Sequence, residues 1–112
     1  MKKSLFKLLC VFLLTTSCFV PAQAVFVSDA PTVLITGSNR GLGLEFSRQY
    51  AEAGWNVIAT CRNPEQAEEL KALAKQRNQV VIEKMDVTSD SEVEVLAFKY
   101  QNHPIDVLLK HK

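Results

Sequence analysis

Eight residues near the start of the chain have the types and spacing of a phosphate-binding loop. Three glycines follow a threonine in the pattern Thr-Gly-x-x-x-Gly-x-Gly, between a short aliphatic run and a segment with helical periodicity. Gly37 can turn the chain sharply, Gly41 can admit a phosphate close to the backbone, and Gly43 can bring the helix close to the strand. The first N–H groups of the helix then face the phosphates. The residues predicted to bind a dinucleotide in this way are Gly37, Ser38, Asn39, Arg40, Gly41, Leu42 and Gly43.

Two arginines favour NADP(H) over NAD(H) as that dinucleotide. In NAD-binding units, an acidic residue about 20 positions beyond the loop accepts hydrogen bonds from the ribose hydroxyls. Here the second predicted strand ends in Thr60-Cys61-Arg62, without a carboxylate. Arg62 can pair with a 2′-phosphate through bidentate hydrogen bonds, and Arg40 is placed to help. The alternative is that Arg62 is a solvated surface residue.

A third predicted binding feature is the pair Asp86-Val87, which follows the third predicted strand. A carboxylate there can accept from the amino group of an adenine base, and the next residue can line the base. The alternative is an aspartate that begins a helix and contacts no ligand.

Alternating strands and helices are predicted to position these residues. Aliphatic side chains dominate 32–35, 56–61, 80–85 and 105–109, as in strands buried on both faces of a parallel sheet. Helices are predicted over 41–53, 63–78 and 89–100. This β-α-β-α-β-α-β pattern predicts an α/β, Rossmann-type, doubly wound parallel sheet that is incomplete, with strand order 3-2-1-4.

Helical spacing predicts which positions each helix buries. In the helix over 41–53 they are Leu42, Phe46, Tyr50 and Ala53. In the helix over 63–78, with Asn63 as N-cap, they are Ala67, Leu70, Leu73 and Ala74. The third helix starts with a capping box formed by Ser89 and Glu92. Its buried positions are Val93, Leu96, Ala97 and Tyr100.

The first 24 residues have the pattern of a signal peptide. A basic start precedes the apolar run 8–14, and Ala22-Gln23-Ala24 has the small-x-small form of a cleavage site. The apolar run is shorter than the roughly 20 residues of a spanning helix, so no stable membrane span is expected. The sequence predicts a signal peptide over 1–24 and a partial nucleotide-binding domain over 25–112. The product is exported if this leader is real, and cytoplasmic if the start site is misassigned.

Charge and cysteine content exclude several other functions. The leader holds three of the 13 basic residues and none of the 12 acidic ones, so 25–112 has 10 basic and 12 acidic residues, a net charge of −2. Because the basic residues are scattered, no nucleic-acid partner is expected. Cys61 is the one cysteine beyond the leader, and no His, Cys and carboxylate cluster has the spacing of a metal site.

From Thr32 to Leu109 the sequence resembles the short-chain dehydrogenase/reductase family. The likeness is specific in the glycine loop, in Cys61-Arg62-Asn63-Pro64, in Asp86-Val87-Thr88 and in 105–108. The resemblance implies a nicotinamide cofactor, with an Asp-Val pair against its adenine. Within the family, 40–46 and 59–62 look most like the C-factor subgroup, one member of which is associated with intercellular signalling.

The resemblance also implies what is missing. In the family the fourth strand runs into Asn-Asn-Ala-Gly, and a catalytic serine and Tyr-x-x-x-Lys follow. Here Lys110-His111-Lys112 stands where the family has Asn-Asn-Ala-Gly. No Tyr-x-x-x-Lys occurs in the sequence. We therefore expect no catalytic residue in this chain, no turnover by it alone, and an N-terminal NADP(H)-binding part of an oxidoreductase.

Two alternatives stay open at this stage. One is a non-catalytic fragment that binds a nucleotide or nothing, and the other is a secreted C-factor-like signalling protein. An incomplete doubly wound sheet also leaves part of one face and the fourth strand uncovered, which favours self-association through that face or edge.

Overall fold

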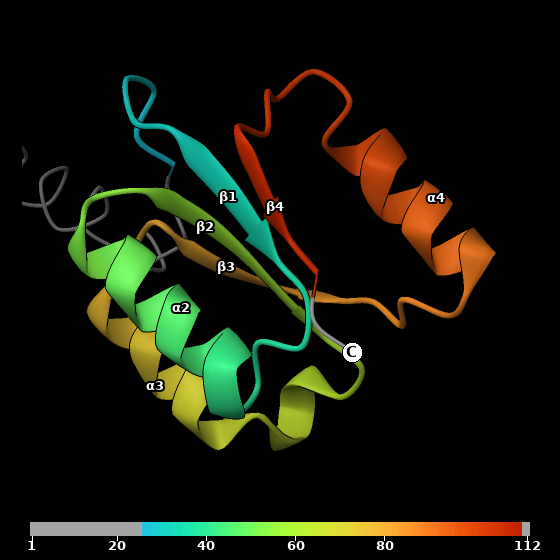
Figure 1. The fold of residues 1–112 in the computed structure, drawn as a ribbon, viewed down its shortest axis with the longest axis horizontal. Coiled ribbons are helices and arrows are strands. Elements are labelled where there is room, and N and C mark those ends of the chain that lie inside the picture. The colour runs from blue at the N-terminus through green and yellow to red at the C-terminus, as the bar shows by residue number, and fades with distance from the viewer. Residues whose placement is uncertain (1–25, 111–112) are drawn as a thin grey trace, which may run out of the picture.

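Four parallel strands form one sheet in the order β3-β2-β1-β4 in the computed structural model (Figure 1), which describes residues 26–110. The predicted α/β class and strand order are confirmed. The predicted leader and the last two residues lie outside the described part. The elements are β1 (Thr32–Ile35), α2 (Gly41–Glu52), β2 (Asn56–Cys61), η1 (Pro64–Gln66), α3 (Glu68–Gln76), β3 (Val80–Lys84), α4 (Asp90–Lys99) and β4 (Val107–Leu109).

The two central strands, β1 and β2, are buried at every position, because helices pack on both faces of the sheet. Their parallel register aligns Thr32 with Asn56 and Ile35 with Ala59. All four strands therefore end at the same edge of the sheet, where parallel α/β sheets bind their ligands. Within residues 26–110, no helix has both the length and the apolar content needed to cross a membrane.

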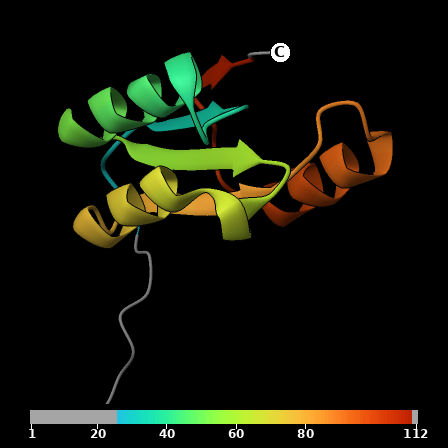
Figure 2. The same ribbon diagram turned by 90° about the horizontal axis from the view of Figure 1, so that it is seen from below.

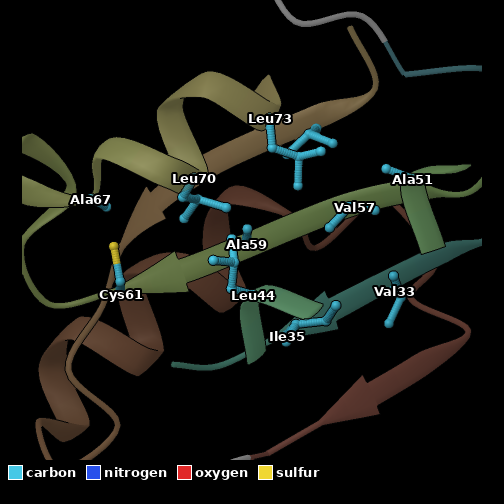
Figure 3. Packing of buried hydrophobic residues seen from close by; sticks show 11 residues of the cluster. Val33, Ile35, Leu44, Ala51, Val57, Ala59, Cys61, Ala67, Leu70 and Leu73 are labelled. Atoms are coloured by element: carbon cyan, nitrogen blue, oxygen red, sulfur yellow. The ribbon is translucent and has the colours of Figure 1, made fainter. Parts of the chain in front are cut away.

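The first face of the sheet packs against α2 and α3. Val33, Ile35, Val57 and Ala59 point toward these helices (Figure 3). The helix side of this core is formed by Leu44, Ala51, Ala67, Leu70 and Leu73.

Of the four positions predicted to face inward on α2, Tyr50 packs against the core, whereas Leu42, Phe46 and Ala53 are exposed. Leu42 is 59% exposed and Phe46 is 37% exposed, whereas the buried residues of α2 are Gly43, Leu44, Ser47 and Ala51. Three of these are small and lie four positions apart, so the helix backbone can approach the sheet and the glycine loop closely. The Ser47 hydroxyl is satisfied within the helix, since it donates to the carbonyl of Gly43 at 2.8 Å.

The single helix predicted over 63–78 is divided into the short turn η1 and the helix α3. Asn63 occupies the predicted N-cap position, at the start of η1, but its side chain makes no capping hydrogen bond. The predicted inner stripe is confirmed, because Ala67, Leu70 and Leu73 are buried and Ala74 packs against the same core.

The second face is covered by α4 alone among the described helices (Figure 2). Leu34 and Ile58 pack there with Met85 and Leu96. Leu96 is the one buried residue of α4, and the predicted inner residues Val93 and Ala97 are exposed. Tyr100 packs against this core, as predicted.

The predicted capping box is half formed. The Ser89 hydroxyl accepts from the Glu92 N–H at 3.4 Å. The Glu92 carboxylate does not return to Ser89 but accepts from the N–H of Asp86 at 3.3 Å.

Strand β4 is shorter than the predicted range 105–109. The N–H of Thr32, which a longer strand would pair with a backbone carbonyl, donates to the Asp106 carboxylate at 2.8 Å. The Asp106 N–H in turn donates to the Thr32 carbonyl at 2.9 Å, and the paired residues of β4 begin at Val107.

Candidate functional site

A cavity of about 700 Å³ lies at the carboxyl edge of the sheet. The segment after each of the four strands contributes to it, so the fold gathers residues that are up to 73 positions apart in the sequence, from 37 to 110. Its lining residues are Gly37, Asn39, Arg40, Gly41, Cys61, Arg62, Met85, Asp86, Val87, Thr88 and Lys110.

The glycine loop is held to the sheet by backbone and side-chain hydrogen bonds. Ser38 is buried, its N–H donates to the carbonyl of Thr60 at 3.0 Å and its hydroxyl donates to the carbonyl of Ile35 at 2.7 Å. Gly37 and Gly41 have φ angles of 62° and 60°, in the left-handed region that favours glycine. The loop is therefore fixed without using the groups that line the cavity.

Gly43 and Gly41 serve different purposes. A Cβ at Gly43 would lie 2.1 Å from the carbonyl oxygen of Gly37, so α2 packs directly on the glycine loop. The expectation that Gly43 lets the helix approach the strand is corrected to this contact with the loop. A Cβ at Gly41 would meet no atom within 4 Å, so the space beside this residue is open to a ligand.

The N-terminus of α2 is suited to an anion. Arg40 precedes the helix in an extended conformation, no side chain caps the helix, and its first turn carries no acidic residue. The first backbone bond at this end joins the N–H of Leu44 to the carbonyl of Arg40 at 3.3 Å. The preceding N–H groups have no partner within the helix, as at any helix start, and carry its positive dipole end.

The cavity carries three basic side chains and one carboxylate. Arg40, Arg62 and Lys110 are exposed, and within residues 26–110 none of them forms an ion pair. The carboxylate is that of Asp86. This excess of positive charge suits a ligand with several phosphate charges.

Asp86 is held in its ionised form by Thr88. The Thr88 hydroxyl donates to Oδ1 of Asp86 at 2.7 Å, and the Thr88 N–H donates to the same oxygen at 2.9 Å. These bonds, with smaller contributions from the charges of Arg62 and Lys84, lower the pKa of Asp86. The carboxylate can therefore act as an acceptor toward a ligand amino group.

Seven of the ten predicted site residues line the cavity. Ser38 and Gly43 shape the loop from behind, and Leu42 is exposed outside the lining. Sequence reasoning missed four lining residues, namely Cys61, Met85, Thr88 and Lys110. The sequence could have indicated these four residues by their position, because each lies at or just after the carboxyl end of a strand. The part that these residues play in binding stays a prediction.

The tyrosine and histidine side chains of residues 26–110 do not line this cavity. The Tyr100 hydroxyl donates to Glu83, and burial together with this bond raises the pKa of Tyr100. His103 bonds the hydroxyl of Thr32 at 2.8 Å, away from the cavity. Burial raises the pKa of the Cys61 thiol, which disfavours the reactive thiolate. The described His, Cys, Asp and Glu residues form no group of three that could hold a metal ion.

Residues 31–110 match the family model of the short chain dehydrogenase. The chain therefore belongs to the short-chain dehydrogenase family, and the resemblance found in the sequence is confirmed. The likeness to the C-factor subgroup stays a prediction.

Similar proteins are longer reductases. Over 85 residues the chain is 36% identical to (-)-isopiperitenone reductase of Mentha piperita, which covers 70% of this chain and 27% of that protein. A carbonyl reductase of Pseudomonas aeruginosa PAO1 in complex with NADP superimposes with a TM-score of 0.68 and 27% identity, covering 71% of this chain and 37% of that one. An actinorhodin polyketide ketoreductase with NADPH superimposes with a TM-score of 0.67 and 28% identity, covering 78% and 34% of the two chains.

Proposed function

We propose that this chain is an NADP(H)-binding N-terminal part of a short-chain dehydrogenase/reductase. The observation that carries the proposal is the cavity in which an open glycine loop meets Arg40 and Arg62, while no carboxylate stands at the end of β2. The two similar structures that contain NADP or NADPH support the same cofactor class.

The described residues fit such a cofactor. The free space beside Gly41 and the uncapped start of α2 suit the pyrophosphate. In this proposal Arg62, helped by Arg40, binds the 2′-phosphate, and Asp86 with Val87 contacts the adenine base; all four residues line the cavity. Nicotinamide, when bound, supplies hydride transfer to or from a carbonyl or alcohol carbon.

The proposal is tested by titrating the full 112-residue chain with NADPH and with NADH, followed by the fluorescence of the reduced nicotinamide. We expect binding of both, with NADPH bound about tenfold more tightly, because a charge-assisted bond to the extra phosphate contributes about 1.5 kcal/mol. Arg62→Gln should remove this preference. Arg77→Gln, an exposed arginine at the end of α3, is the matched control. Equal affinities in the wild-type chain, or a preference that survives Arg62→Gln, would contradict the assignment.

We propose also that the chain alone catalyses no turnover. Its sequence has no Tyr-x-x-x-Lys, and within residues 26–110 no tyrosine lines the cavity. Incubating the pure chain with NADPH and a panel of ketones and aldehydes should leave the absorbance of NADPH unchanged. Sustained oxidation that depends on the carbonyl compound would refute this part.

Export is a further proposal and rests on the sequence pattern of the first 24 residues. The N-terminus of the mature protein, read by mass spectrometry from the extracytoplasmic fraction, should be Val25. An intact Met1 on a cytoplasmic product would overturn export.

We propose a second copy of the chain as a binding partner. Leu108 of β4 is 63% exposed, and Val95 and Phe98 of α4 are 69% and 72% exposed. The Leu109 carbonyl bonds β1, so the backbone groups of Leu108 point to the free edge of the sheet. Two β4 strands can then pair antiparallel about Leu108, with the two Leu108 residues opposite each other.

A further inference from the structure

The last described strand ends beside the glycine loop. Strand β4 pairs with β1 so that Leu109 aligns with Ile35. The carbonyl of Leu109 accepts from the N–H of Thr36 at 3.0 Å. Lys110 therefore leaves β4 at the point where the chain turns into the loop through Gly37, and both residues line the cavity.

Lys110 is available to a ligand. It is exposed, and the ion pairs of the described residues use other basic side chains, namely Arg48, Lys71, Lys84 and Lys99. The short-chain dehydrogenase pattern that the sequence resembles has neutral residues at this place, so the lysine belongs to this chain rather than to the family pattern.

The strand order separates Lys110 from Arg62. Arg62 follows β2 and Lys110 follows β4, and the loop after β1 lies between them. Neighbouring strands are about 4.8 Å apart, so the two strand ends are about 10 Å apart. The two cations therefore flank the glycine loop and approach a ligand on that loop from opposite sides.

We infer that Lys110 binds the pyrophosphate that NADP(H) and NAD(H) share, while Arg62 binds the 2′-phosphate that distinguishes them. This inference rests on the proposed function. Lysine serves here as a point charge toward a phosphate, as an ammonium group commonly does. Lys110 then contributes to affinity for every dinucleotide and for ADP, and makes no contribution to the choice between NADPH and NADH.

The inference is tested on the full chain by titrating NADPH, NADH and ADP into the wild type, Lys110→Gln and Arg62→Gln. Lys110→Gln should weaken all three ligands by the same factor, about three- to fivefold for an exposed charge pair, and should reduce the dependence of affinity on salt. Arg62→Gln should weaken NADPH alone. Lys75→Gln, an exposed lysine of α3 outside the cavity, should change nothing. Circular dichroism of each variant checks that the fold is retained.

The outcomes distinguish a failure of the inference about Lys110 from a failure of the proposed function. If the wild type binds dinucleotides and Lys110→Gln leaves every affinity and the salt dependence unchanged, Lys110 has no role and the proposed function stands. If Lys110→Gln weakens NADPH but neither NADH nor ADP, the lysine binds the 2′-phosphate and the inference is overturned. If the wild type binds none of the three ligands, the proposed function itself fails, and the inference with it.

Discussion

At the scale of single residues, Thr88 keeps the Asp86 carboxylate in its charged form. Its hydroxyl and N–H bond the ionised form of Asp86, so the pKa of this carboxyl group is lowered. Because the pKa of Asp86 is lower in the folded protein than in the unfolded chain, where it is about 3.9, the ionised carboxylate stabilises the fold at pH values above that value. This stabilisation is lost as the pH falls through the pKa of the folded protein. Asp86 is thus fully ionised wherever the protein is studied near neutral pH.

Thr88→Val is expected to raise the pKa of Asp86 toward its ordinary value, because it removes the hydroxyl that makes the largest contribution to the shift. Thr88→Ser retains this hydroxyl and is the control. The carboxyl carbon shift of Asp86, followed by NMR between pH 2 and pH 6 (roughly two units either side of the ordinary value), measures both. Identical titration curves for the two variants would show that the hydroxyl is not responsible.

Gly43 leaves no room for a side chain. Its Cβ would overlap the Gly37 carbonyl at 2.1 Å, and both partners are backbone and cannot move alone. We expect Gly43→Ala to lower the free energy of unfolding by about 3 kcal/mol or more. Gly41→Ala adds no clash and should cost only about 1–2 kcal/mol for its left-handed backbone. Urea unfolding compares the two, and an equal loss would contradict the assigned contact.

At the scale of elements, α4 differs from α2 and α3 in how it is held. It buries only Leu96, but its end is tied to β3 by polar contacts. Oε2 of Glu83 accepts from the Tyr100 hydroxyl at 2.5 Å and from Lys99 Nζ at 2.6 Å. The Glu83 side chain is 13% exposed, so water competes little for these bonds.

Glu83→Ala is expected to loosen α4 without disturbing α2 and α3. Loss of both bonds should lower the free energy of unfolding by about 1 kcal/mol, since Lys99 is largely exposed. Hydrogen exchange should become faster over residues 90–99 and stay unchanged over 41–52. Glu94→Ala, an exposed change on α4 itself, is the control. Unchanged exchange in α4 would mean that apolar packing alone holds it.

On the scale of the whole molecule, the two faces of the sheet are unequally covered. Helices α2 and α3 lie on one face and α4 lies on the other (Figure 2). The chain spans 27% of (-)-isopiperitenone reductase and 37% of the carbonyl reductase chain. Apolar side chains are left exposed on α4 and β4, and we assign the β4 edge at Leu108 to a second copy.

Leu108→Lys should therefore convert the associated chain to a monomer. A charge at the centre of the proposed strand pair places two lysines opposite each other and removes an apolar contact. Sedimentation velocity over a range of concentrations measures the change. Val27→Lys, an exposed apolar position outside β4, is the control. A wild-type chain that stays monomeric at all concentrations, or a Leu108→Lys chain that still associates, would refute this interface.

The sequence by itself determined the strands, their order and most of the cavity. Consecutive aliphatic residues and glycine spacing are local patterns, and short right-handed crossovers leave few ways to order the strands. The sequence also predicted that Gly41, Arg62 and Asp86 lie close together, because parallel strands bring their carboxyl ends to one edge.

Only the tertiary structure decided the contacts between distant residues. The rotation of α2 depends on the fit of Gly43 against Gly37, which hydrophobic periodicity cannot register because three of the buried positions are small or polar. The start of β4 is held by the hydrogen bond from the Thr32 N–H to the Asp106 carboxylate, which joins residues 74 positions apart. Lys110 enters the cavity only because β4 pairs beside β1, a contact between residues more than 70 positions apart.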